Sequence, residues 1–148
     1  LRSHRCGLVV QGAFRYVHAA AAGEEHVVGY AFAGEFVGDY ISMCVDAPSQ
    51  VTIGAMCGAE ALLVPGERLE TFYRTDAACE RLGRRLAEHM LAEVYERLLD
   101  RYAASPQQRY EALTERCPDV LQLVPLRELA SYLGVRPETL SRIRRRVR

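Results

Sequence analysis

The chain has 148 residues, and its 19 Arg are balanced by 19 acidic residues, so the formal net charge is zero without a single Lys. Its hydrophobic fraction of 49% is ample for a packed core, and no run of about 18 apolar residues is present. No basic-then-apolar segment opens the chain either. These features argue against a membrane-spanning helix and a signal peptide, and we expect a cytoplasmic protein.

Five cysteines are spread along the chain, at Cys6, Cys44, Cys57, Cys79 and Cys117. The odd count and the lack of a C-x-x-C pair argue against a disulfide framework or a zinc ribbon. We interpret them as small, reduced, buried hydrophobic residues, since free Cys is commonly buried. A redox response through Cys44 or Cys57 is the alternative.

The neutral total hides an asymmetry of charge along the chain. Residues 1–104 contain 10 Arg and 14 acidic residues, whereas residues 105–148 contain 9 Arg and 5 acidic residues. The last thirteen residues, RPETLSRIRRRVR, contain six of those Arg. A basic end on an acidic body indicates a polyanionic partner for that end.

Residues 7–64 are predicted to be rich in β-structure. They contain short runs of Val, Tyr and Phe separated by Gly, namely LVV, FRYV, VVGYAF, VTIGA and ALLV. Val28, Tyr30 and Phe32 alternate with a period of two, as in a half-buried strand. Several short strands at this spacing predict a small barrel or sandwich.

A long helix is predicted from Asp76, the expected N-cap, to about Ala103. Apolar residues recur along it at four-residue spacing, which drifts around a 3.6-residue helix and makes the apolar stripe broad. We therefore expect the helix to contact its own β-rich domain on one side and a second copy of the chain on the other. The expected dimer contacts are Leu82, Leu86, Met90, Leu91, Val94 and Leu98. A helix packed only on its own domain is the alternative.

Three further helices are predicted after this one. Ser105 and Pro106 begin a helix that reaches Arg116 and is ended by Cys117-Pro118. Pro125 begins the next helix, which reaches Leu133, and Pro137 begins the last. The sequence thus predicts a β-rich sensor domain over 1–75, a dimerisation helix over 76–104 and a DNA-binding domain over 105–148.

The last two helices fit the apolar pattern of a helix-turn-helix. Gly134 falls at the turn, where the backbone needs a positive φ. The positions that face the other helix or flank the turn are all apolar: Leu126, Leu129, Ala130, Leu133, Val135, Leu140 and Ile143.

That register leaves polar side chains on the outer face of the last helix. The predicted base-reading residues are Arg136, Glu138, Thr139, Ser141, Arg142 and Arg145. Arg can bond guanine O6 and N7, and Glu can accept a hydrogen bond from cytosine N4. Arg144, Arg146 and Arg148 suit phosphate oxygens. The alternative is a solvated helix whose Arg serve solubility.

The stretch VPLRELASYLGVRPETLSRIRRR resembles the DNA-binding domain of Crp/Fnr-type transcription regulators. GEFVGDYISM, the long helix and SPQQRYEALTERCPDVLQLVP are also similar to that family, so the likeness covers residues 7–148. The resemblance implies an α+β fold with an N-terminal β-roll, a long dimerisation helix and a C-terminal helix-turn-helix of the winged-helix type. Glu138, Ser141 and Arg142 match the E-x-x-S-R reading motif of the Fnr branch.

The chain departs from the family at both ends. The strands that usually begin the sensor domain are reduced to LRSHRC, so we expect residues to be missing before Leu1 or between Cys6 and Gly7. The chain also stops just after the last helix, so we expect the wing to be reduced or absent.

The effector pocket departs from the family as well. In the family, the phosphate-binding cassette uses Gly-Glu for the ribose and Arg followed by Ser or Thr for the cyclic phosphate. Gly38-Asp39 and Ser49-Gln50 stand in those places, and no Lys or Arg lies between Tyr16 and Glu67. A buried phosphate without a cation is costly, so we predict no cofactor and no tight binding of cyclic AMP. Backbone N–H groups are the alternative ligands for an anion.

Other chemistries find less support in the sequence. His18, Glu24, Glu25 and His26 fit a cupin-like metal-binding or small-molecule-binding β-roll, but they also fit a surface turn. Cys6 alone does not supply the clustered Cys of an iron–sulfur sensor. No P-loop and no nucleophile elbow is present.

The leading hypothesis is a bacterial, homodimeric, sequence-specific transcription regulator that is not an enzyme and needs no metal. Its expected partners are double-stranded DNA, with TTGA-like half-sites in an inverted repeat, and RNA polymerase as a further candidate. The alternative is a cupin-like protein or enzyme with a helical tail.

Overall fold

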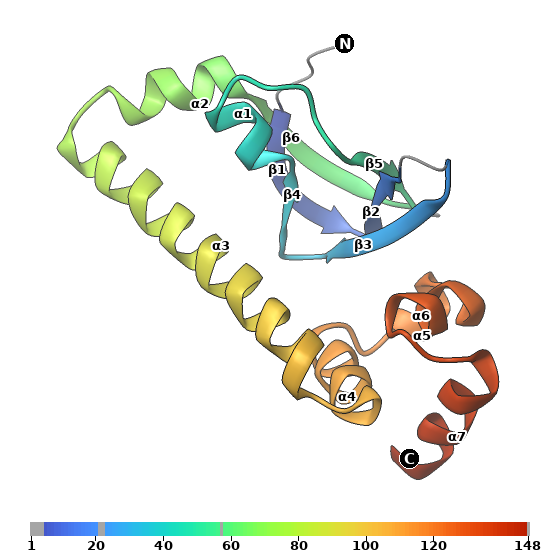
Figure 1. Cartoon of the computed structure of the whole chain (residues 1–148). Coiled ribbons are helices and arrows are strands. Elements are labelled where there is room, and N and C mark those ends of the chain that lie inside the picture. Colours follow the sequence, from blue (N-terminus) through green and yellow to red (C-terminus); the bar gives the residue numbers. More distant parts are fainter. Residues whose placement is uncertain (1–4, 21–22, 57, 148) are drawn as a thin grey trace.

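A computed structural model describes residues 5–20, 23–56 and 58–147 (Figure 1). Its N-terminal part is built from two antiparallel three-stranded sheets with the strand orders β4-β1-β6 and β3-β2-β5. The strands are β1 Arg5–Gln11, β2 Ala13–Ala19, β3 Glu25–Phe32, β4 Phe36–Gly38, β5 Thr52–Ala55 and β6 Glu60–Pro65. A small core of Val9, Ala31 and Val37 lies between the two sheets. The five predicted β-runs are confirmed.

Two helices of this part were not predicted. The helix α1 spans Tyr40–Cys44 and α2 spans Gly66–Tyr73. The first is only five residues long, too short to show a helical period in the sequence.

The strand β1 runs through Cys6 and Gly7 without a break, pairing Cys6 with both Gly38 and Val64.

The long helix α3 spans Ala77–Ala103, as predicted (Figure 1). Asp76 is its N-cap, and its carboxylate accepts hydrogen bonds from the backbone N–H groups of Ala78 at 2.7 Å and Cys79 at 2.9 Å. Near its start the helix packs on α2, where Gly83 lies against the Tyr73 ring so closely that a Cβ would clash at 2.8 Å. From there α3 runs beside the β-roll to the C-terminal helices.

Four helices follow α3: α4 Pro106–Arg116, α5 Val120–Leu123, α6 Leu126–Tyr132 and α7 Pro137–Val147. Ser105 caps α4 in a capping box with Gln108, and Pro106 is at the first position, which confirms the predicted start. The short α5 was not predicted. The prediction that α6 reaches Leu133 is correct within one residue, because Leu133 is its C-cap.

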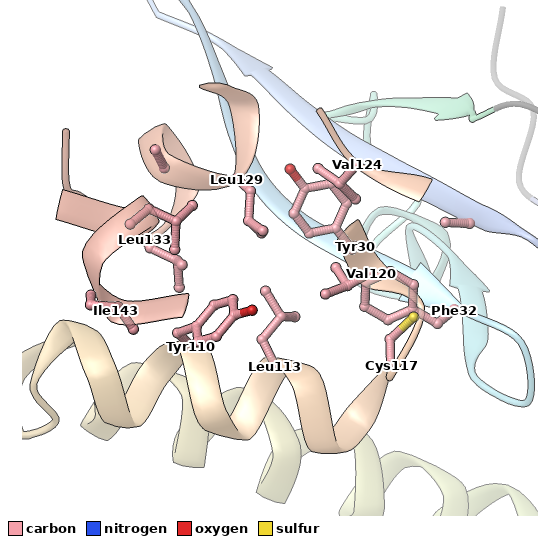
Figure 2. Packing of buried hydrophobic residues seen from close by; sticks show 13 residues of the cluster. Tyr30, Phe32, Tyr110, Leu113, Cys117, Val120, Val124, Leu129, Leu133 and Ile143 are labelled. Carbon is pink, nitrogen blue, oxygen red and sulfur yellow. The ribbon is translucent and has the colours of Figure 1, made fainter. Parts of the chain in front are cut away.

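The largest hydrophobic core joins the β-roll to these helices (Figure 2). Tyr30 and Phe32 of β3 are 1% and 2% exposed, and they pack among buried residues of α4, α5, α6 and α7. Ala31, on the opposite face of β3, is also buried, against the other sheet. The prediction of a half-buried strand is therefore wrong for the end of β3, because both of its faces are covered: the helices cover Tyr30 and Phe32, and the other sheet covers Ala31.

The cysteines differ from one another in their surroundings. Cys117 is buried, Cys6 and Cys79 are half-buried, and Cys44 is exposed at the end of α1. The interpretation of all of them as buried residues is therefore wrong for Cys44, because it lies on an exposed part of α1 where Ile41 and Val45 also face solvent. Cys57 lies outside the described residues.

Candidate nucleic-acid interface

The helices α6 and α7 form a helix-turn-helix around the predicted apolar residues. Leu129, Ala130 and Leu140 are fully buried, and Ile143 is 8% exposed. Gly134 adopts a φ of 68°, the left-handed conformation that its place in the turn predicted. The turn is closed by hydrogen bonds from Gly134 N to Ser131 O at 3.0 Å and from Val135 N to Ala130 O at 2.9 Å.

The outer face of α7 carries the predicted reading residues together. Arg136, Glu138, Arg142, Arg145 and Arg146 are exposed, whereas Thr139, Ser141 and Arg144 are half-buried. Arg142 Nη2 lies 3.4 Å from Thr139 Oγ1, so the two side chains share one patch. Arg148 lies outside the described residues. This face combines cationic guanidinium groups with one carboxylate and two hydroxyls, the groups that contact phosphates and base edges.

Arg109 of α4 connects the end of α3 with the turn of the helix-turn-helix, a role that sequence reasoning missed. Its Nη1 donates to the carbonyl of Ala104, the C-cap of α3, and its Nη2 donates to that of Leu133, the C-cap of α6, both at 2.8 Å. Carbonyls at helix C-termini lack intrahelical partners and favour a cation. One guanidinium therefore satisfies the ends of two helices.

The predicted dimer residues of α3 divide into two groups. Leu86 and Met90 are half-buried, whereas Leu91, Val94 and Leu98 are 69%, 60% and 49% exposed. Leu82, Tyr95, Leu99 and Tyr102 are also exposed. Since a four-residue step turns by about 40° more than one helical turn, the predicted stripe passes from the intramolecular side at Leu86 to open solvent at Leu98. The exposed residues of the second half of α3 form an apolar face.

The predicted effector residues lie together but bond to one another. The Asp39 carboxylate caps α1 by accepting from Ser42 N at 3.2 Å and Ser42 Oγ at 2.5 Å, and it accepts from Ser49 Oγ at 2.6 Å. Burial raises the pKa of Asp39, but the hydrogen bonds from Ser42, Ser49 and the Gln50 backbone outweigh it and lower the pKa. Gly38 has a φ of 143°, and a Cβ there would meet Cys6 at 2.7 Å. The Asp39 carboxylate is thus already occupied by the protein's own donors.

The two histidines of the alternative hypothesis face each other across the sheet. His18 of β2 pairs with His26 of β3 in the antiparallel register. His18 Nδ1 lies 2.9 Å from Gln50 O, and His26 Nε2 lies 3.7 Å from Glu24 Oε2. In the described part of the chain, no group of three or more His, Cys, Asp or Glu side chains is arranged to hold a metal ion.

Comparisons with solved structures identify the fold, although no family model and no curated protein sequence matches the chain. A putative cAMP-binding regulatory protein from Silicibacter pomeroyi is similar with a TM-score of 0.68 at 23% identity, over 97% of this chain and 66% of that one. FixK2 from Bradyrhizobium japonicum is similar with a TM-score of 0.66 at 19% identity, over 98% and 75%. This chain has the fold of the Crp/Fnr regulators.

A putative Crp/Fnr-family transcriptional regulator from Eubacterium rectale is similar to the same extent, with a TM-score of 0.66 at 16% identity. The similarity covers 95% of this chain and 67% of that one. The chain therefore spans about two thirds to three quarters of these three Crp/Fnr-type structures. Within the described residues, no helix has the length and apolar character needed to cross a membrane.

Proposed function

We propose that this chain is a sequence-specific DNA-binding transcription regulator of the Crp/Fnr type rather than an enzyme. The observation that carries the proposal is the outer face of α7. Glu138 and Arg142 are exposed on this helix, whose inner face is fixed by Leu140 and Ile143, and the exposed Arg136 directly precedes it. In helix-turn-helix proteins, the helix that follows the turn is the element that enters the major groove.

The proposed readout assigns a separate role to each side chain. Arg142 bonds a guanine, Glu138 accepts from the cytosine of a G·C pair, and Ser141 contacts a neighbouring base edge, with thymine the expected one. Arg144 and Arg146 hold phosphates, and Arg136, Thr139 and Arg145 lie at the border of the same patch. By resemblance to the E-x-x-S-R branch, each half-site is TTGA-like.

We propose homodimerisation through the exposed apolar face of α3. A large exposed apolar patch on a helix is typical of a site that is covered by another protein surface. In a two-fold dimer the two α7 helices lie about 34 Å apart, one turn of DNA, so the target is an inverted repeat. In this proposal residues 1–75 form the sensor domain, 76–104 the dimerisation helix and 105–148 the DNA-binding domain, and RNA polymerase is a further partner.

The proposed sensor responds to an effector other than cyclic AMP. Asp39 and Ser49 are bonded to each other at 2.6 Å, and the cassette region has no Arg or Lys to hold a cyclic phosphate. An anion held there would depend on backbone N–H groups alone.

A gel-shift titration on a promoter fragment tests the proposed function. We expect a retained complex whose association constant falls steeply with salt, because phosphate contacts release counterions. The alternative, a cupin-like binding protein or enzyme with a helical tail, predicts no retained complex or one that is insensitive to salt.

A further inference from the structure

We propose that Arg116 of α4 and Glu35 of the β3–β4 turn act as positioning residues that hold the DNA-reading helices in a fixed orientation on the β-roll. The inference rests on the proposed function for its consequence on DNA, but the contact itself is independent of it. Neither residue belongs to the predicted reading, dimer or effector sets.

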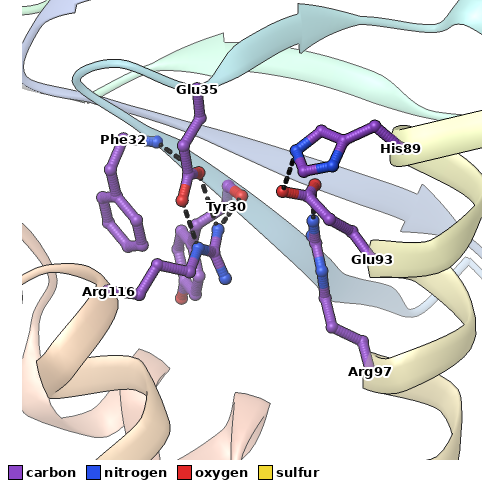
Figure 3. A network of polar contacts seen from close by, with 7 residues as sticks. All are labelled: Tyr30, Phe32, Glu35, His89, Glu93, Arg97 and Arg116. Carbon is purple, nitrogen blue, oxygen red and sulfur yellow. Dashed lines mark hydrogen bonds and ion pairs between the residues drawn. The ribbon is translucent and has the colours of Figure 1, made fainter. Parts of the chain in front are cut away.

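The Arg116–Glu35 contact is a two-pronged ion pair between the two parts of the chain (Figure 3). Arg116 Nε donates to Glu35 Oε1, and Nη2 donates to Glu35 Oε2 at 2.9 Å. Both side chains are only about a quarter exposed, at 24% and 26%. A forked pair that is largely removed from water is stronger and more directional than a surface ion pair.

Further contacts fix the Arg116 guanidinium in the same place. Nη2 also donates to the backbone carbonyl of Tyr30 at 2.6 Å, and the guanidinium carbon lies 4.9 Å from the centre of the Phe32 ring. Glu35 is fixed in turn, because its Oε2 accepts from Phe32 N at 3.0 Å. Arg116 is the last residue of α4, so its position sets where the chain turns toward α5 and α6.

A cleft of about 830 Å³ borders this contact, and Arg116 itself is part of its lining. The cleft separates the second half of α3 from β3, α4 and the end of α6. Glu93 and Arg97 of α3 pair with each other at 2.9 Å rather than with Glu35 or Arg116 (Figure 3). The helices are therefore held on the β-roll through its β3 face rather than through α3. The hydrophobic core around Tyr30 and Phe32 supplies the packing there, and the Arg116–Glu35 pair adds a directional contact.

The arrangement in which Arg116 and Glu35 are paired is compatible with DNA reading. Arg136, Glu138 and Arg142 are exposed while Arg116 and Glu35 are paired. A dimer that reads two half-sites at one fixed spacing gains affinity when its two reading helices are preorganised. We therefore assign the ion pair a positioning role in the binding-competent state.

The test uses Glu35→Gln, Arg116→Gln and the double variant in the full chain. Glu70→Gln is the matched control, because it removes the exposed ion pair with Arg74 within α2. Arg116→Lys, which keeps the charge but not the fork, replaces Arg116→Gln if that variant does not fold. Affinity is measured on a full inverted repeat selected from random DNA and on a single half-site. Fluorescence energy transfer is measured between dyes introduced as non-natural residues at the exposed positions 67 and 122, with one labelled copy in excess unlabelled chain.

We expect each single variant to lose about tenfold in affinity for the full repeat, with little change on a single half-site. The double variant should lose no more than either single variant, and the distance distribution should broaden in all three but not in the control. Unchanged or tighter binding to the full repeat, or an equal loss on the half-site, overturns the positioning role. An unchanged distance distribution overturns the claim that the ion pair fixes the orientation of the helices on the β-roll. If the wild-type chain binds no DNA specifically, the proposed function fails. The distance measurement still decides whether the ion pair fixes the orientation of the helices.

Discussion

The hydroxyl of Tyr30 on β3 donates a 2.9 Å hydrogen bond to Oε1 of Glu128 on α6, across 98 positions of sequence. The other carboxylate oxygen of Glu128 accepts from Arg15 of β2 at 2.9 Å. The Tyr30 ring also meets the Tyr132 ring edge-on, with centroids 4.9 Å apart. One face of the β-roll thus binds the first helix of the helix-turn-helix through hydrogen bonds to Glu128 and a ring contact with Tyr132.

Replacing Tyr30 with Phe should lower the free energy of unfolding by about 1 kcal/mol, because the ring stays packed while the hydrogen bond to Glu128 is lost. Urea unfolding followed by circular dichroism measures this change. Glu70→Gln is the control, since it removes only the exposed ion pair with Arg74 at the end of α2. An equal effect of the two substitutions would contradict the structural role of the Tyr30 hydroxyl.

The same hydroxyl should make stability depend on alkaline pH. Burial, followed by the hydrogen bond and the negative charge of Glu128, raises the pKa of Tyr30 far above its ordinary value of 10.0. Because the folded-state pKa is raised, this stability is fully present below pH 10 and is lost as the pH rises above it. Burial and the neighbouring Cys44 also raise the pKa of Tyr40, to about 12, in the same direction.

The free energy of unfolding of the wild type should therefore fall more steeply than that of Tyr30→Phe between pH 10.5 and 12, by up to about 1.4 kcal/mol per pH unit. Urea titrations across this range measure both slopes. Parallel slopes would show that Tyr30 ionises equally easily in the folded and unfolded chains.

Replacing Leu91 and Leu98 with Glu should convert the proposed dimer into monomers in analytical sedimentation. Both side chains are exposed in the isolated chain, so the substitutions leave its core intact while placing charges in the proposed interface. Leu62→Glu is the control, because Leu62 is 65% exposed on β6, away from α3. A variant that stays dimeric would place the interface elsewhere.

Cyclic AMP should show no binding at micromolar concentration in titration calorimetry. The Asp39 carboxylate is occupied by Ser42 and Ser49, and no cation of the cassette region is available to a phosphate. Binding in the micromolar range would mean that backbone donors alone suffice for the cyclic phosphate.

The sequence predicted the features that depend on neighbouring residues. The caps at Asp76 and Ser105 and the left-handed Gly134 were predictable because each is decided within one turn of chain. The Arg116–Glu35 pair joins residues 81 positions apart, and no local pattern indicates such a contact. The run VVGYAF did contain a signal, since a continuous apolar run also fits a strand that is buried on both faces.

The central claim is that the outer face of α7 reads a base sequence. Arg142→Ala should cost roughly 1–3 kcal/mol per half-site and relax the preference at one base pair. Arg146→Ala should weaken binding to all sequences alike and reduce the salt slope by about one, as expected for a phosphate contact.

Selection of bound sequences from a random DNA pool, with the wild type and Arg142→Ala in parallel, tests this claim most directly. We predict an inverted repeat of TTGA-like half-sites about one helical turn apart, in which the Arg142→Ala pool loses its preference at a single G·C pair. A wild-type pool with no enriched repeat, or an enriched repeat that is unchanged by Arg142→Ala, would contradict it.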